Sequence, residues 1–105
     1  LALPDGAGDE EYLTLLKSAL PDLIRKQKPD FIFYLAGVDV LASDKLGKMA
    51  LTKAGCKSRD RFVFEQCLAN NIPVQVSMGG GYSPDIRDIV DAHCNTFRLA
   101  DELYF

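Results

Sequence analysis

The feature that most constrains this chain is an unbroken apolar run over residues 31–36, which ends at Gly37. A strand with one wet face alternates apolar and polar residues, because successive side chains point to opposite faces of a sheet. This run has no polar member, so it predicts a strand that is covered on both faces, as in a parallel sheet. A second strand is predicted over residues 74–78, directly before three glycines at 79–81.

An amphipathic helix is predicted before the first strand, over residues 9–28. Its apolar side chains recur at three-to-four spacing from Tyr12 to Ile24. Asp9 is the predicted N-cap, and Pro29 ends the helix. Pro21 falls inside the pattern, so we expect a kink or a restarted helix there.

Two further helices are predicted, one after each strand. Thr52 can cap a helix that runs to about Ala69, and Ser83 with Pro84 suit the N-cap and first position of the next. The last helix carries an apolar stripe made of Ile86, Ile89, Val90, His93 and Phe97. A strand–helix–strand order implies parallel strands joined by a right-handed crossover. The predicted fold class is therefore α/β, a three-layer α/β/α arrangement with parallel strands, in a single segment 1–105.

Two strands alone cannot cover the apolar run on both faces and both edges. Leaving two of its side chains in water would forfeit about 1.5–3 kcal/mol each, a large share of the ~5–15 kcal/mol that stabilises a domain. We expect the missing sheet to come from more of the same polypeptide, in preference to another chain or a self-paired edge in an oligomer. The first residue is Leu1 rather than Met, in keeping with a start inside a longer gene product.

Charge and composition argue against several classes of function. The net charge is −3, with 12 basic and 15 acidic residues, so direct nucleic-acid binding is not expected. No apolar run approaches the ~20 residues that cross a bilayer, and four acidic residues lie where a signal peptide would begin. Three cysteines without a C-x-x-C motif favour reduced thiols and a cytoplasmic location. These cysteines and His93 are most simply core or near-core residues.

The predicted topology brings two candidate site residues together. Open α/β sheets bind ligands at the edge where the carboxyl ends of parallel strands meet. Asp39 follows the first predicted strand and Tyr82 the second, so we expect both to face a common crevice. Taken alone, Asp39 is more simply a strand-end turn former and Tyr82 a packing residue. The glycines at 79–81 are a weak phosphate-loop signal, because no G-x-G-x-x-G motif or P-loop lysine accompanies them.

Several motifs, in this order and at this spacing, resemble a known family. They are AGVDV at 36–40, DKLG at 44–47, LT at 51–52 and GGGY at 79–82. Together they resemble the C-terminal part of zinc-dependent histone deacetylases, and the opening residues 3–12 match the same family. Residues 57–64 and 72–74 are most similar to the class IV branch and its bacterial relatives. The resemblance covers essentially all 105 residues.

The resemblance implies the C-terminal portion of an arginase/deacetylase-type fold, in an enzyme that hydrolyses acyl-lysine or a related amide. The family binds Zn²⁺ through two aspartates and one histidine, and Asp39 matches the last of these ligands. Tyr82 matches the tyrosine that polarises the acyl carbonyl, and Gly80 and Gly81 would let the substrate approach closely. The other ligands and a histidine pair lie upstream in the family. This chain alone is therefore expected to be inactive without the missing N-terminal part of the same domain.

Some features leave alternatives open. Many relatives have glycine at the position of Ser43, which would be strained if the loop needs a positive φ there. Met78 precedes the glycines where a smaller or polar side chain is common. The neighbouring Arg59 and Asp60 could either brace the site or pair across subunits. The alternative function is a non-catalytic α/β interaction module that needs a partner chain.

Overall fold

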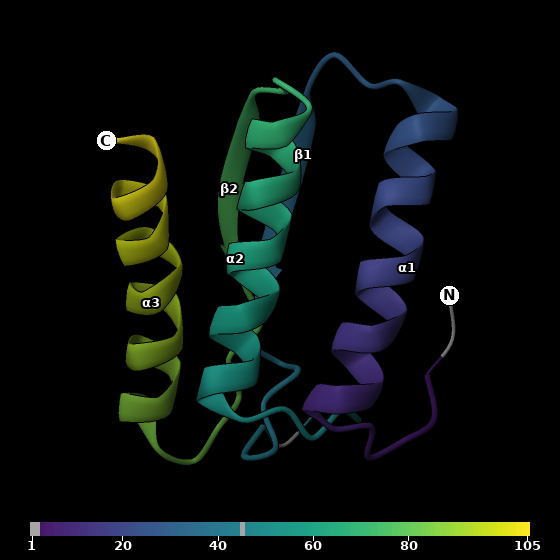
Figure 1. Ribbon diagram of the computed structural model, residues 1–105. Helices are drawn as coiled ribbons and strands as arrows, with labels where there is room; N and C mark the ends of the chain where they lie inside the picture. The colour runs from purple at the N-terminus through teal and green to yellow at the C-terminus, as the bar shows by residue number, and fades with distance from the viewer. Residues whose placement is uncertain (1–2, 45) are drawn as a thin grey trace.

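The computed structural model describes residues 3–44 and 46–105. Its elements follow the predicted order: α1 (Asp9–Gln27), β1 (Ile32–Gly37), α2 (Lys53–Ala69), β2 (Val74–Gly79) and α3 (Ile86–Tyr104). The two strands are parallel and in register, from Ile32 opposite Val74 to Gly37 opposite Gly79. The three helices stand side by side over one face of the sheet, with α2 between α1 and α3 (Figure 1). No described helix is long and apolar enough to cross a membrane.

Strand β1 is covered by helices on one face only. Phe33 is 77% exposed and Leu35 is 68% exposed, whereas Ala36 is buried. Tyr34, which lies between Phe33 and Leu35 in the sequence, points to the helices. Its hydroxyl donates a hydrogen bond to the Asp60 carboxylate of α2 at 2.5 Å. The described residues thus supply a sheet and one helical layer. The second face of β1 is left for the additional cover that the sequence predicts.

Helix α1 begins and continues differently from the prediction. Gly8, not Asp9, occupies the N-cap position. The Asp9 carboxylate instead accepts hydrogen bonds from the backbone N–H and the hydroxyl of Thr52 at 2.8 and 2.5 Å. Of the two alternatives expected at Pro21, a kink or a restarted helix, the restart is wrong, because α1 runs unbroken through this residue. The carbonyl that loses its N–H partner there belongs to the exposed Lys17, where water can replace the bond.

Helix α3 also starts later than predicted. Asp85, not Ser83, is the N-cap, and its carboxylate accepts a hydrogen bond from the Arg87 N–H at 2.9 Å. The Ser83 hydroxyl is used elsewhere, because it donates to Ser43 Oγ at 2.9 Å. Pro84 therefore lies before the helix rather than at its first position.

The apolar stripe predicted on α3 does not face the described core. Three of its members, Ile86, Val90 and Phe97, are exposed. The buried residues of the helix are Ala92, Thr96 and Leu99. An apolar stripe shows that a helix needs cover, but the stripe does not show which neighbour supplies it.

The packed core lies directly beneath the carboxyl ends of the strands. Val38 and Leu41, which follow β1, pack with Cys56 of α2 and Ala92 of α3. Burial raises the pKa of the Cys56 thiol to about 11, so this side chain is protonated and packs as a small apolar group. Cys56 and the two other cysteines are unpaired. This core supports the loops that carry the candidate site residues.

Candidate functional site

The loops that follow the two strands lie at the same edge of the sheet, the one formed by the carboxyl ends of the strands. Gly37 lies opposite Gly79 at the carboxyl ends of β1 and β2. The Val38 N–H extends the ladder by donating to the Gly79 carbonyl at 3.0 Å. The segments that carry Asp39 and Tyr82 therefore leave the sheet side by side, which is the arrangement that the parallel topology predicts.

Asp39 lies in the turn after β1, with its side chain exposed and its backbone tightly enclosed. A Cβ at Gly80 would lie 2.9 Å from the Asp39 Cβ and 3.0 Å from its backbone nitrogen, and Gly80 has φ of +66°. Gly47 also approaches Asp39 closely, since a Cβ at Gly47 would lie 1.7 Å from the Asp39 carbonyl oxygen. Glycine is needed at both positions, because any side chain would push Asp39 out of place.

Tyr82 stands at the end of the glycine loop with 57% of its side chain exposed. Gly81 before it has φ of +108°, and a Cβ there would lie 3.1 Å from Ile89 Cγ2. The Tyr82 backbone N–H donates to the Asp44 carboxylate at 2.6 Å. The backbone of Tyr82 is thus held in place while its ring projects at the surface.

Asp44 is a buried carboxylate that sequence reasoning did not select for a role. Its Oδ1 accepts hydrogen bonds from the N–H groups of Leu46 and Gly47 at 2.9 and 2.8 Å, and its Oδ2 accepts the bond from Tyr82. Burial acts to raise the pKa of the Asp44 carboxyl, but the three N–H donors outweigh it and lower the pKa below its ordinary value. The signal for Asp44 is its place in the DKLG motif at 44–47, but its partner Tyr82 is 38 residues away.

Arg59 and Asp60 form a buried brace behind the site. The guanidinium of Arg59 donates to the Gly37 carbonyl at 2.6 Å and to Asp60 Oδ1 at 2.8 and 2.9 Å. Asp60, which is 0% exposed, also accepts hydrogen bonds from the hydroxyls of Tyr34 and Thr96. Of the two alternatives for this pair, the contacts favour bracing, since they tie the end of β1 to α2 and α3.

The two departures from the family pattern are accommodated. Among the described non-glycine residues only Lys28 and Asn71 have a positive φ, so Ser43 is not strained. Its hydroxyl oxygen accepts the hydrogen bond from Ser83, which links the same two loops as the Asp44 contact. Met78 is largely exposed.

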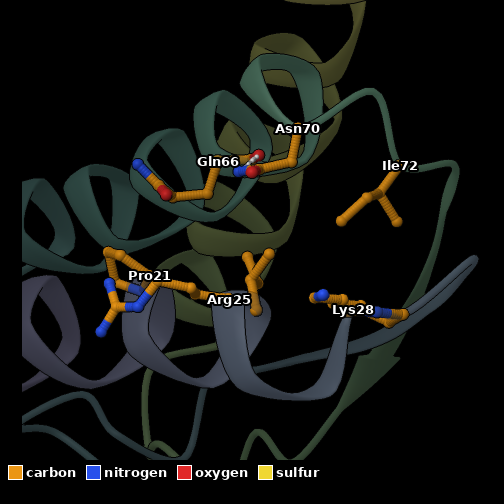
Figure 2. A pocket seen from close by; sticks show the side chains of 8 residues that line it. Pro21, Arg25, Lys28, Gln66, Asn70 and Ile72 are labelled. Carbon is orange, nitrogen blue, oxygen red and sulfur yellow. Dashed lines mark hydrogen bonds between the residues drawn. The ribbon is translucent and has the colours of Figure 1, made fainter.

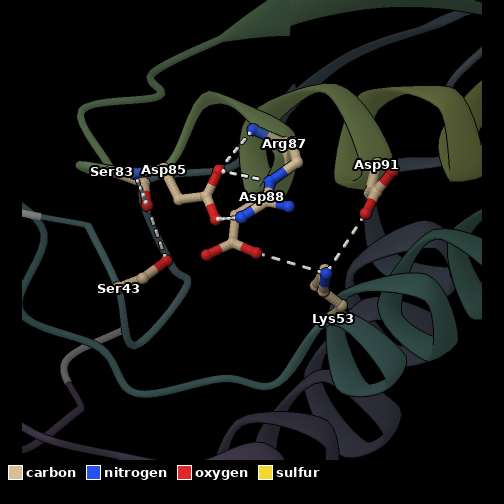
Figure 3. A network of polar contacts seen from close by, with 7 residues as sticks. All are labelled: Ser43, Lys53, Ser83, Asp85, Arg87, Asp88 and Asp91. Atoms are coloured by element: carbon tan, nitrogen blue, oxygen red, sulfur yellow. Dashed lines mark hydrogen bonds and ion pairs between the residues drawn. The ribbon is translucent and has the colours of Figure 1, made fainter.

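A surface network of charges joins the starts of α2 and α3 near this edge (Figure 3). Lys53 lies between Asp88 and Asp91, 3.2 Å from a carboxylate oxygen of each, and Arg87 pairs with Asp85. These groups are partly or largely exposed, and exposed ion pairs contribute little stability. We interpret the network as a solvated helix start, in line with the acidic first turn that a helix dipole favours.

No complete metal site is formed by the described part of the chain. Within residues 3–44 and 46–105, no three His, Cys, Asp or Glu side chains gather to hold an ion. Asp39 fits one position of a Zn²⁺ site, because it offers exposed carboxylate oxygens at a strand end. His93 lies on α3 with its Nδ1 buried and without a described partner, and burial lowers its pKa.

A pocket of about 530 Å³ lies at the opposite edge of the sheet (Figure 2). Its walls are formed by the C-terminal half of α1 and the end of α2. Lys28, which precedes β1, and Ile72, which precedes β2, complete the lining. Arg25, one of its lining residues, is paired with Asp22. The pocket contains none of the predicted site residues, so it is no candidate for their crevice.

Comparisons with known proteins decide the family. Residues 1–97 match the family model of the histone deacetylase domain. The chain belongs to the histone deacetylase family. Its fold is of the deacetylase type as predicted, because it is similar to the crystal structure of the HDA15 HD domain with a TM-score of 0.74. That similarity has 24% identity and covers 90% of this chain and 26% of the other.

Two relatives show how much of such a protein this chain represents. An uncharacterized protein of Picosynechococcus sp. is 44% identical over 104 residues, which are 99% of this chain and 35% of that protein. Histone deacetylase 2 of Arabidopsis thaliana is 38% identical over 77 residues, which are 73% of this chain and 20% of that protein. The chain thus spans about a third of the length of the first relative and a fifth of the length of the second. The finer likeness to the class IV branch stays a prediction.

Proposed function

We propose that this chain is the C-terminal portion of a zinc-dependent deacetylase that hydrolyses acyl-lysine or a related amide. The observation that carries the proposal is the meeting of two loops at one sheet edge, with Gly80 against Asp39 and Asp44 bound to Tyr82. Membership of the histone deacetylase family supports the reaction class. The short span relative to the Arabidopsis relative supports a missing N-terminal part.

In this proposal Asp39 is a zinc ligand. A carboxylate is a hard, charged donor that binds Zn²⁺ without first losing a proton at neutral pH. When bound, Zn²⁺ would polarise the amide carbonyl and lower the pKa of a water molecule. One carboxylate is not a metal site, so the remaining ligands and the histidine acid–base pair come from the N-terminal part. The 105-residue chain alone is expected to be inactive and to bind zinc poorly.

Tyr82 is the proposed hydrogen-bond donor to the substrate carbonyl. Its exposed ring and fixed backbone support this role, because a phenol hydroxyl that donates to the carbonyl oxygen stabilises the negative charge that develops there during attack. Gly80 and Gly81 are the proposed substrate-binding residues, because a backbone without side chains lets the acyl group come close.

The test uses the complete protein, meaning this chain together with the rest of its polypeptide. We expect Asp39→Ala to lose zinc in metal analysis, because a charged ligand is removed. We expect Tyr82→Phe to keep zinc and to lose about 10²–10³ in turnover of an acyl-lysine peptide. Asp30→Ala is the control, since Asp30 is exposed at the opposite end of β1. An Asp39→Ala protein that retains zinc, or a Tyr82→Phe protein of normal turnover, contradicts the assigned roles.

A second candidate function rests on the exposed face of β1. Large apolar side chains there need cover, which a partner chain could provide in a non-catalytic α/β interaction module. The coding sequence upstream of this chain distinguishes the two functions. The deacetylase needs an Asp-x-His motif and a His-His pair there, whereas a reading frame that lacks both supports the interaction module.

A further inference from the structure

We propose that Asp44 is a positioning residue that holds Tyr82 in place to meet the substrate carbonyl, and that Asp44, through its bonds to Leu46 and Gly47, links Tyr82 to Asp39. The inference deepens the proposed function and rests on the role assigned there to Tyr82.

One oxygen of Asp44 makes the local contact with the described residues Leu46 and Gly47 that is here called the turn. Oδ1 accepts the N–H groups of Leu46 and Gly47, two and three residues further along the chain. Aspartate and asparagine both make such local turns, because either side chain presents an oxygen to the following N–H groups. The turn therefore needs only one acceptor atom and does not need a carboxylate.

The second oxygen of Asp44 makes a bond that the turn does not need. Oδ2 accepts the Tyr82 N–H at 2.6 Å, across 38 residues of chain. The Asp44 side chain is 8% exposed, so water competes poorly for this bond. A hydrogen bond to an ionised acceptor is shorter and stronger than a neutral one. Asp44 thus fixes the backbone at the base of the Tyr82 side chain.

The far end of the same turn contacts Asp39. Gly47 packs so closely on the Asp39 carbonyl oxygen that no side chain fits between them. One short turn therefore touches the backbone of both residues that the proposed function uses. A shift of about 1 Å in such a support can lower the rate about 10²-fold, because the reacting groups lose their alignment.

The first variant is Asp44→Asn in the complete protein. Its single oxygen can keep the turn, but its amide nitrogen is a donor and cannot accept the Tyr82 N–H. We expect kcat to fall about 10- to 100-fold, with KM changed less than about twofold and with zinc content unchanged. A variant that loses zinc, or that raises KM with kcat unchanged, overturns the inference.

The matched control is Ser43→Ala. The hydrogen bond between Ser83 and Ser43 joins the same two loops one residue away, but it is exposed and uncharged. We expect kcat of this variant to stay within about twofold of the unmodified protein. A loss equal to that of Asp44→Asn would mean that any link between the loops matters, and this result overturns a specific role for Asp44.

A double-mutant cycle separates positioning from general support. If Asp44 acts through Tyr82, then Asp44→Asn should lower kcat less than about twofold once Tyr82→Phe is present. A loss in the Tyr82→Phe background equal to that in the unmodified protein overturns the inference about Asp44. Normal turnover of Tyr82→Phe by itself overturns the proposed role of Tyr82 instead, so the two failures are distinguishable.

Discussion

Asp60 is the buried charge on which three elements converge. Its carboxylate is enclosed by the guanidinium of Arg59 and by the hydroxyls of Tyr34 on β1 and Thr96 on α3. A charge without water is tolerated only when it is paired and hydrogen-bonded, and these partners meet that need. Because Arg59 also binds the Gly37 carbonyl, the packing of the helices is coupled to the strand end that leads to Asp39.

Removing this carboxylate should strongly destabilise the protein. We expect Asp60→Ala to lower the free energy of unfolding by about 3–5 kcal/mol, because it leaves Arg59 buried without a counter-charge. Denaturant unfolding of the complete protein measures the change. Asp101→Ala is the control, since Asp101 is exposed on α3 and should change stability by less than about 0.5 kcal/mol. Equal stability of the two variants would contradict the brace.

The low pKa of Asp44 should make part of the stability depend on pH. The N–H donors stabilise the ionised carboxyl only in the folded state, so its folded pKa lies below the unfolded value of about 3.9. The resulting stabilisation is present above that pH and is lost as pH falls through the folded pKa. We expect the stability difference between the unmodified protein and Asp44→Asn to shrink as the pH falls from about 6 through the folded pKa of Asp44. Urea unfolding across this range gives the difference, and a constant value would contradict the assignment.

At the scale of elements, the starts of α1 and α2 are joined by one carboxylate. Asp9 on the first turn of α1 accepts both the N–H and the hydroxyl of Thr52, the N-cap of α2. Thr52 in turn accepts the Gly55 N–H at 2.9 Å. A Cβ at Gly55 would lie 1.9 Å from Asp9 Oδ1, so this helical glycine makes room for the contact.

We expect Thr52→Ala to lower the free energy of unfolding by about 1 kcal/mol, because the Gly55 N–H and the Asp9 carboxylate each lose a partner. Thr52→Ser should restore most of the stability, since the serine hydroxyl can make the same two bonds. Thermal unfolding of both variants provides the measurement. Equal loss in the serine and alanine variants would mean that the Thr52 methyl group, and not the cap, carries the effect.

At the scale of the whole molecule, the two-stranded sheet of the described residues is open on one face and along the outer side of each strand. Phe31, Phe33 and Leu35 form an exposed apolar row on the face of β1 that no described helix covers. Exposed faces and unpaired strand edges are templates for association. Under the proposed function, the rest of the deacetylase domain would cover this row in the complete protein.

We expect the isolated 105-residue chain to self-associate. Changing Phe33 and Leu35 together to serine should shift the chain toward the monomer, because it removes apolar surface without touching the helical core. Size-exclusion chromatography with light scattering measures the mass. Phe105→Ser is the control, since Phe105 is fully exposed and lies beside Val74 and Val76 of β2 and the helices, not in the apolar row of β1. A compact monomer of the unmodified chain would contradict the requirement for cover.

Sequence reasoning located the site edge but not its supports. The apolar run at 31–36 and the glycines at 79–81 placed Asp39 and Tyr82 on neighbouring parallel strands, and the structure has that topology. The sequence did not identify Asp44 as the partner of Tyr82, because a carboxylate can accept a hydrogen bond from any N–H group that the fold brings near it. The roles of Asp39, Tyr82, Gly80 and Gly81 stay predictions.

The sequence by itself determined the order of helices and strands, their parallel pairing and the family, because apolar periodicity, capping residues and motif spacing act over short stretches of chain. Only the tertiary structure decided which acceptor each polar group uses. Asp9 reaches the cap of α2 instead of capping its own helix, and Arg59 reaches the end of β1. These choices depend on which distant segments share a space, and that is determined by packing of the whole chain.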